Sequence, residues 1–310
     1  MNPVDENNII CGMQDNSIGV YKNGIWQSES GLGDVGPVRF DPNPTNNGNN
    51  AYCTSVSAFS FFFRRNINGV WEDKSPKDAE TQQANIDWYS KFAINPKNTS
   101  QIALGIDRIY ETFDKGNSWG NGAASQVFTK DKANATAISY APDGSLWAVY
   151  GNFLYHRDIN NKWLPPTLTN QYISIKPDFN IGNFPPNGNG LNYDMYLASR
   201  KNISKYNSIT EEIRKIADQP NNDEKINAIE YINDPSVFPL KLLFAATEAG
   251  IYYSIVESGK PLQWNDFTGN LSYPNITDVE YNQNLKMLTI STWGRGAYTI
   301  NLKDALRTIF

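Results

Sequence analysis

Hydrophobic residues in this chain occur in short runs that are separated by polar, turn-forming residues. A typical repeat has a strand-like segment ending in a polar turn, such as residues 92–96, then an apolar run, a short turn and another strand. The apolar runs lie at residues 9–12, 51–55, 101–105, 145–150, 194–198, 242–247 and 286–292. No long stretch keeps the 3.6-residue period of a helix, which excludes a solenoid of helix pairs. The pattern predicts an all-β chain.

Tryptophans recur about every 45 residues in the same local setting, at the end of a polar turn. The series is Trp26, Trp71, Trp119 and Trp163, with Trp264 two periods further on. The missing member falls near Ile213. This period predicts seven repeat units, at approximately residues 1–30, 34–73, 86–122, 131–167, 171–218, 225–269 and 275–310.

Seven units with up to four short strands each predict a seven-bladed β-propeller of four-stranded antiparallel blades. The first unit lacks its innermost strand and the last lacks a clear outermost strand, so we expect both blades to be incomplete. No linker divides the chain, so we expect one domain over residues 1–310. The two ends do not obviously complement each other. Either the tail at 303–310 completes the last blade, or the domain is part of a longer natural chain.

Composition limits the possible partners. The chain has 310 residues, 13% of them aromatic, and a net charge of −5 without a basic run, so we do not expect it to bind nucleic acid. No apolar run approaches the roughly 18 residues of a membrane helix, so we expect no membrane insertion. The N-terminus has no signal-peptide pattern, so an exported protein would contain this chain as an excised domain or a processed form.

Few residues are available for metal or redox chemistry. His156 is the only histidine, which argues against a histidine-based metal cluster or a Ser-His-Asp triad. Cys11 and Cys53 each lie in an apolar run, and two buried thiols are favoured over a disulfide. We therefore expect no metal and no cofactor.

One segment carries a recognisable motif. Thr112, Asp114, Gly116, Ser118 and Trp119 match the Asp-box, or BNR repeat, S/T-x-D-x-G-x-S/T-W. The chain thus resembles the Asp-box superfamily of sialidase-type, xyloglucanase-type and sortilin-type propellers, and residues 64–71 and 156–163 keep the spacing in degenerate form. The resemblance implies that this turn lies on the outer edge of a blade, between the third and fourth strands. It therefore implies a structural role for Thr112, Asp114, Gly116 and Trp119.

The same resemblance bears on catalysis. A sialidase-type site would need an arginine triad, a Tyr/Glu nucleophile pair and an acid/base Asp, and the arginines of this chain lack the expected spacing. A xyloglucanase-type site lies between two propellers, whereas one is predicted here. A non-enzymatic binding module is therefore favoured. The alternatives are a glycoside hydrolase-like enzyme with rim carboxylates, and a purely structural propeller of a larger secreted or surface protein.

A binding site is expected where the turns that join the second and third strands gather at the rim of the propeller. These turns contribute charged and aromatic side chains, which could bind a carbohydrate or a protein surface. The loop at residues 72–87 is a second candidate for partner contact. The expected location is extracellular or at the cell surface, and the oligomeric state is left open. The candidate ligand-binding residues are Asp15, Asp107, Arg108, Arg200, Lys201, Glu248, Trp293 and Arg295, with Phe59 as a further aromatic of the rim.

Overall fold

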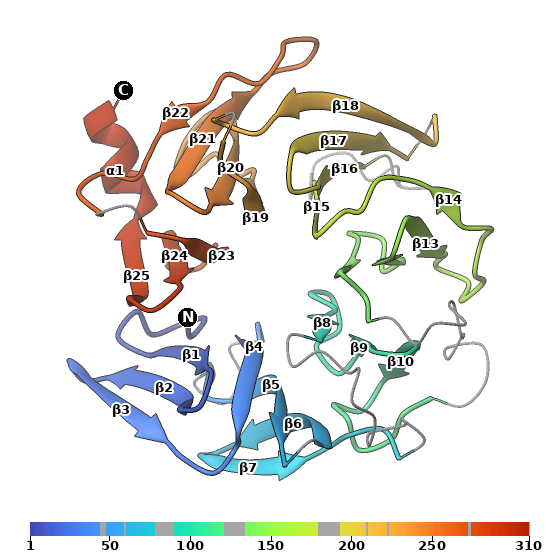
Figure 1. Cartoon of the computed structure of the whole chain (residues 1–310), viewed down its shortest axis with the longest axis vertical. Helices are drawn as coiled ribbons and strands as arrows, with labels where there is room; N and C mark the ends of the chain where they lie inside the picture. Colours follow the sequence, from blue (N-terminus) through green and yellow to red (C-terminus); the bar gives the residue numbers. More distant parts are fainter. Residues whose placement is uncertain are drawn as a thin grey trace. The chain divides into compact units, whose positions relative to one another are not determined.

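The computed structural model describes residues 1–43, 48–58, 60–77, 90–120, 134–178, 193–208, 210–221, 223–271 and 274–309. They form seven antiparallel sheets, in each of which strands adjacent in sequence are paired (Figure 1). Their number and pairing are those of a seven-bladed β-propeller, which confirms the predicted fold class. The sheets are called blades 1 to 7 in chain order. They belong to two compact units, which are described separately; a single domain over the whole chain remains a prediction.

The first unit, Met1–Tyr140 and Gly144–Thr169, contains blades 1 to 4. Blade 1 has β1 (Ile9–Met13), β2 (Ser17–Lys22) and β3 (Ile25–Glu29); blade 2 has β4 (Asp34–Phe40), β5 (Ala51–Ser57), β6 (Ser60–Ile67) and β7 (Val70–Asp73). Blade 3 has β8 (Lys91–Ile94), β9 (Ile102–Gly105) and β10 (Ile109–Thr112); blade 4 has β11 (Ala137–Tyr140), β12 (Leu146–Tyr150), β13 (Phe153–Arg157) and β14 (Thr167–Leu168).

The second unit, Ala141–Asp143 and Asn170–Phe310, contains blades 5 to 7. Blade 5 has β15 (Ser174–Pro177), β16 (Asp194–Ala198), β17 (Asn202–Asn207) and β18 (Glu212–Asp218); blade 6 has β19 (Ile226–Ile232), β20 (Lys241–Thr247), β21 (Ile251–Val256) and β22 (Asn265–Asp266). Blade 7 has β23 (Ile276–Asn282), β24 (Met287–Thr292) and β25 (Gly296–Asn301), and α1 (Leu302–Ile309) follows it.

Blades 1 and 7 are incomplete, as predicted. Trp26 lies on β3 as Trp71 lies on β7, so the strands of blade 1 correspond to the second, third and fourth strands of blade 2. Blade 7 ends at its third strand. The described residues of the tail form α1 instead of an outer strand, because Leu302 and Leu306, four residues apart, enter the core between blades 6 and 7.

Apolar side chains fill the spaces between successive blades of each unit. Between blades 2 and 3, Phe63 contacts Phe92 and Trp119 edge-on, with ring centroids 5.5 and 5.3 Å apart. Such edge-to-face pairs add about 0.5–1.5 kcal/mol to the burial of their area. The core is thus divided among the blade interfaces.

The tryptophan period has a structural reason at three of these interfaces. The indole N–H of Trp71 donates to Glu29 at the end of β3, 2.6 Å away. Trp119 donates to the carbonyl oxygen of Lys74, just after β7, at 2.6 Å, and Trp264 to that of Asp218, at the end of β18, at 3.1 Å. Each of these tryptophans therefore ties its blade to the outer strand of the preceding blade.

Both cysteines are free thiols, which agrees with the favoured interpretation. Cys53 is completely buried, whereas Cys11 is only partly buried. Burial raises the pKa of the Cys53 thiol to about 12, with a smaller opposing effect of Arg64. No helix among the described residues is long and apolar enough to cross a membrane.

Candidate functional site

The candidate site residues lie in the predicted turns between second and third strands. In the first unit, Asp15 lies in the β1–β2 turn, and Asp107 and Arg108 lie in the β9–β10 turn. In the second unit, the β16–β17, β20–β21 and β24–β25 turns carry Arg200 and Lys201, Glu248, and Trp293 and Arg295, respectively. Phe59 and residues 78–87 of the expected loop lie outside the described residues.

The first-unit candidates contact residues of their own turn or of the next blade. Asp15 has a φ of 60°, and its N–H donates to the carboxylate of Asp34 at 2.7 Å. Arg108 pairs with the adjacent Asp107, with both its Nε and its Nη2 3.0 Å from the same carboxylate oxygen. Asp107 is only 9% exposed. The Asp107–Arg108 pair therefore shapes its turn, and the guanidinium of Arg108 also lies over the ring of Tyr110, 5.7 Å from its centroid.

In the second unit, two asparagines connect the turns of successive blades. The guanidinium of Arg200 in blade 5 donates to the side-chain oxygen of Asn227 on β19. The amide nitrogen of Asn227 donates to Asn275 Oδ1 at 2.9 Å and to the carbonyl oxygen of Ile276 at 2.8 Å, both at the start of blade 7. A backbone hydrogen bond also links blades 5 and 6, since the N–H of Ile226 donates to Arg200 O at 2.9 Å. A single amide side chain thus links blades 5, 6 and 7.

The carboxylates beside this path are partnered. Glu248 lies 3.6 Å from the ammonium group of Lys225, and its N–H donates to Lys225 O. Glu224 accepts hydrogen bonds from Thr247 at 2.9 Å and from Tyr252 at 3.1 Å. These bonds hold the start of β19 against the β20–β21 turn.

Trp293 stands out in this group because 59% of its surface is exposed. The backbone N–H of Trp293 donates to the backbone oxygen of Asn275 at 2.8 Å. The side chain of the same Asn275 accepts a hydrogen bond from Asn227, so the backbone that carries the indole is held by this asparagine. Lys201 and Arg295 are exposed, and their side chains make no hydrogen bond or ion pair with the described residues. We call Arg200, Lys201, Asn227, Glu248, Asn275, Trp293 and Arg295 the second-unit rim.

Sequence reasoning missed Asn227 and Asn275. Each stands at the first strand of its blade, immediately beside a predicted strand residue, Ala228 or Ile276. In an antiparallel blade, the start of the first strand lies at the same edge as the turn that follows the second strand. That rule, applied to asparagines next to first strands, could have found them.

A group of carboxylates lies on the first strands of the same unit. Glu230 on β19 forms an ion pair with Lys176 on β15, and its side chain is 12% exposed. Burial raises the pKa of Glu230; Lys176 opposes this effect, and Glu280 and Asp278 on β23 add to it. A carboxyl group that retains its proton more readily than usual is suited to general acid chemistry.

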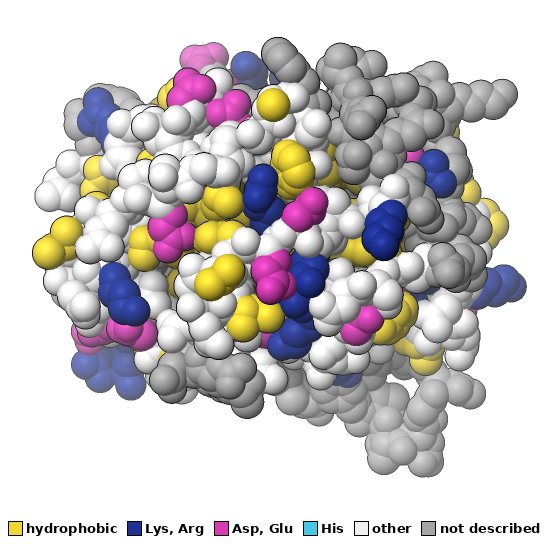
Figure 2. All heavy atoms as spheres, turned by 90° about the horizontal axis from the view of Figure 1, so that it is seen from below, with side chains coloured by type: hydrophobic (Ala, Val, Ile, Leu, Met, Phe, Trp, Pro, Cys, Tyr) yellow, Lys and Arg dark blue, Asp and Glu magenta, His cyan; other side chains and the backbone are white. Residues whose placement is uncertain are grey.

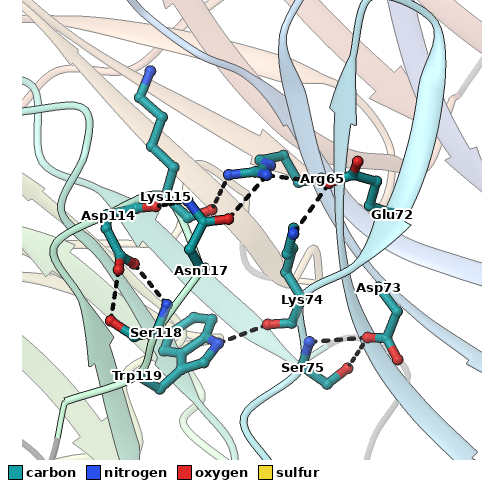
Figure 3. A network of polar contacts seen from close by, with 10 residues as sticks. All are labelled: Arg65, Glu72, Asp73, Lys74, Ser75, Asp114, Lys115, Asn117, Ser118 and Trp119. Carbon is teal, nitrogen blue, oxygen red and sulfur yellow. Dashed lines mark hydrogen bonds and ion pairs between the residues drawn. The ribbon is translucent and has the colours of Figure 1, made fainter.

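The turn at Thr112–Trp119 follows β10 of blade 3 and forms hydrogen bonds to residues of blade 2 (Figure 3). Asp114 accepts bonds from Ser118 N at 2.8 Å, Ser118 Oγ at 2.6 Å and Thr112 Oγ1 at 2.8 Å. Thr112 Oγ1 in turn accepts from Gly116 N at 2.9 Å. Gly116 has a φ of 86°, a left-handed conformation that favours glycine. Burial opposes ionisation of Asp114, but the bonds from Ser118 and Thr112 outweigh it and lower the pKa.

In three other blades, the side chain at the position of Asp114 or near it also accepts a backbone hydrogen bond within the turn, although the sequence of the motif is degenerate. The side-chain oxygen of Asn66 accepts from Gly69 N at 2.9 Å, that of Asp158 from Lys162 N at 2.8 Å, and that of Asn207 from Thr210 N at 3.0 Å. In blade 2, Arg65 adds bonds to Lys115 O at 3.0 Å and to Asn117 at 3.1 Å (Figure 3). All the partners of Asp114 that are described belong to its own turn, so the geometry supports a structural role.

Surface charge is mixed on the face shown in Figure 2, where acidic and basic side chains of the described residues are interspersed. Within the described residues, no group of three or more His, Cys, Asp or Glu side chains is arranged to hold a metal ion.

No protein-family model and no curated protein sequence matches this chain. Among solved structures, it is similar to a chain of the mitotic checkpoint complex, with a TM-score of 0.66 and 8% identity over 96% of this chain and 84% of that one. It is similar to the GH74 xyloglucanase from Xanthomonas campestris, with a TM-score of 0.63 and 12% identity over 98% of this chain and 51% of the enzyme. It is also similar to PorZ, a surface component of the type-IX secretion system of Porphyromonas gingivalis, with a TM-score of 0.56 and 14% identity over 93% of this chain and 44% of PorZ.

This chain therefore spans about half the length of the xyloglucanase and of PorZ. The three proteins differ in what they do, and their identity to this chain is low. The similarity accordingly establishes the β-propeller fold and nothing more specific.

Proposed function

We propose that this chain is a non-enzymatic binding module whose second-unit rim recognises a carbohydrate. The exposure of Trp293 is the observation that carries the proposal. A large aromatic ring is normally buried, and an exposed one beside fixed polar groups is suited to a ligand with both an apolar face and hydroxyl groups. A sugar ring has both.

The neighbouring polar groups support the same ligand class. Asn227 is held by three side-chain hydrogen bonds, so the edge around Trp293 is ordered before a ligand arrives, which lowers the entropic cost of binding. Lys201 and Arg295 remain exposed as donors. These cations favour a sugar that carries acidic groups over a neutral one.

A glycan array tests the proposal. We expect the wild-type chain to bind a defined set of glycans, and Trp293→Ala to weaken that binding by about tenfold or more, since stacking on an aromatic ring contributes on the order of 1–2 kcal/mol. Trp26→Ala is the matched control, because Trp26 is also exposed, at 45%, but lies on the outer strand β3. Equal loss in both variants, or binding only to proteins in a parallel screen, would reject carbohydrate recognition at Trp293.

A glycoside hydrolase-like activity is the second candidate, and Glu230 is the observation that favours it. Burial raises the pKa of Glu230, and the carboxylates of Glu280 and Asp278 add to the effect, so Glu230 is suited to act as a proton donor. Assays with fluorogenic glycosides decide between the two candidates. Turnover that disappears in Glu230→Gln would establish the enzyme and contradict the binding module.

We also propose that the blades are Asp-box repeats and that the chain functions outside the cell or at its surface, within a longer protein. The turn geometry around Asp114 supports the first point, and the similarity to the surface component PorZ supports the second. Protease treatment of intact cells, followed by detection with an antibody against this chain, tests the location; full protection would contradict it.

A further inference from the structure

We propose that the free edge of β25 binds an extended peptide strand of another polypeptide, which completes blade 7 by adding an antiparallel fourth strand. In the described part of the chain, β25 pairs only with β24. The residues that follow it form α1, so the described residues provide no outer strand for this blade. Unpaired edges of this kind are templates for strand addition.

The exposure of β25 differs from that of the equivalent strands. Third strands β17 and β21 consist of buried and partly buried residues only, and each pairs with an outer strand. In β25, five of six residues are exposed, and Tyr298 and Ile300 remain 39% and 40% exposed. A strand at the position of β18 or β22 would cover them. The exposed apolar side chains of β25 are therefore typical of a strand that pairs with a neighbouring strand on both edges.

The edge also lacks the charges that usually protect an open strand. β25 has the sequence Gly-Ala-Tyr-Thr-Ile-Asn, with no charged residue and no proline. The outer strands β3 and β18 are different, because β3 carries Glu29 and β18 carries four charged residues, although the two-residue strand β14 has none. Proteins normally place charge or proline on an edge that has to stay free.

Backbone geometry identifies the groups that a partner would bind. The N–H of Leu302 donates to Lys286 O at 2.9 Å, toward the β24 side. Because N–H and C=O groups alternate along an antiparallel strand, those of Ala297 and Thr299 point to the open edge.

The charges at the two ends of β25 indicate the chemistry of the partner. Arg295 precedes the strand and Lys303 follows it, and both are exposed. Outer strands of other blades end on carboxylates, such as Glu29 on β3 and Asp218 on β18. In blade 1, Glu29 pairs with Ile18, the second residue of the third strand. A peptide in the same register would bring its acidic end next to Arg295. The partner is thus an extended segment with a large apolar residue in its N-terminal half and an acidic C-terminal end.

A labelled peptide with the sequence of residues 25–30, Ile-Trp-Gln-Ser-Glu-Ser, is a suitable probe. We expect fluorescence anisotropy to show saturable binding, weakened several-fold when its Glu is replaced by Gln at low salt, since exposed charge pairs contribute up to about 1 kcal/mol. Thr299→Pro removes one edge donor and should weaken binding about tenfold or more. Thr299→Val keeps the N–H and is the matched control, so it should bind normally.

Hydrogen exchange makes the test independent of how well the proline variant folds. In the wild-type chain, the peptide should slow exchange of the Ala297 and Thr299 amides and leave that of the first-unit edge β7 unchanged. No protection at saturating peptide would overturn the proposal. So would a dimer that Thr299→Pro dissociates, because a second copy would then occupy the edge. Thr299→Pro should retain glycan binding, which separates this inference from the rim.

Discussion

Tyr281 of β23 donates a hydrogen bond of 2.8 Å to the carboxylate of Asp234, which follows β19 of the preceding blade. Lys286 contacts the same carboxylate at 2.7 Å. Tyr231 donates to Asp178 in the same way one blade earlier, also at 2.8 Å. In the second unit, a tyrosine at the end of a first strand is therefore tied to an aspartate that follows the first strand of the previous blade.

The first prediction concerns pH and Asp234. Burial alone would raise its pKa, but hydrogen bonds from Lys286, Ser236 and Tyr281 lower it to about 2. A carboxylate whose folded pKa is depressed stabilises the protein above its unfolded value, near 3.9, and loses that contribution as the pH falls toward the folded value. The contribution is about 2 kcal/mol near pH 7.

Urea unfolding of the wild type and of Asp234→Asn between pH 7 and pH 2 measures this effect. The difference in unfolding free energy should be largest at neutral pH and shrink below about pH 4. Asp304→Asn is the control, because Asp304 is 68% exposed and its pair with Arg307 is 3.6 Å long. A difference for Asp234→Asn that is constant with pH would show that its charge does not matter.

A second prediction concerns the buried pair of Arg157 on β13 and Glu111 on β10, 2.8 Å apart and 2% and 1% exposed. Glu111 also accepts from Tyr140 at 2.6 Å and from Gln101 at 2.7 Å. Arg157→Met leaves a buried carboxylate without its cation and should cost about 3–5 kcal/mol of unfolding free energy.

A double-mutant cycle with Glu111→Leu tests whether the cost comes from the unpaired charge. The double variant should lose clearly less than the sum of the single variants, since neither charge is then left alone. Arg307→Ala, at the exposed pair with Asp304, should change the free energy by less than about 0.5 kcal/mol. Additive losses at Arg157 and Glu111 would contradict the prediction.

The sequence was sufficient to predict the blades and the turns in which the candidate residues lie, because both depend on local patterns. Apolar runs alternate with turn residues, and the tryptophan period reflects bonds such as that of Trp119 to Lys74. The buried ion pair could not be predicted, since Arg157 and Glu111 are 46 residues apart and belong to different blades. The helical tail had a local signal in Leu302 and Leu306, but their burial depends on the surface of blade 6.

The candidate site was predictable only in part, for the same reason. The turns carrying Arg200, Glu248 and Trp293 can be predicted from the order of the strands. The hydrogen bonds that connect one of these turns to another blade cannot. Asn227 links blades 5 and 7 only because the packing of successive blades places the start of β19 beside the β16–β17 turn of blade 5 and the start of β23 in blade 7. In contrast, Asp107 and Arg108 pair with each other, which no periodic pattern reveals.

A third prediction concerns the turn at Asp114. Asp114→Ala removes the acceptor of the Ser118 backbone and hydroxyl bonds and should lower the unfolding free energy by about 2 kcal/mol. Asp114→Asn should cost less, because an asparagine oxygen serves at Asn66 and Asn207. Thermal unfolding with circular dichroism measures both. Equal losses in the two variants would show that the charge, not the acceptor geometry, stabilises the turn.

The fourth prediction separates the order of the second-unit rim from its contact groups. Asn227→Ala removes the acceptor of Arg200 and both donors to the start of blade 7, while Trp293 itself is unchanged. If the rim binds a glycan as proposed, affinity should fall by about tenfold, because Arg200 and the Trp293 backbone lose their common support. Asn265→Ala is the matched control, since Asn265 is exposed and the one described acceptor of its side chain is Gln263 O, at 3.2 Å. Isothermal titration with a glycan identified on the array measures both variants. Unchanged affinity in Asn227→Ala, together with a loss in Trp293→Ala, would mean that the indole binds without help from the asparagine link and that the link serves only to hold blades 5, 6 and 7 together.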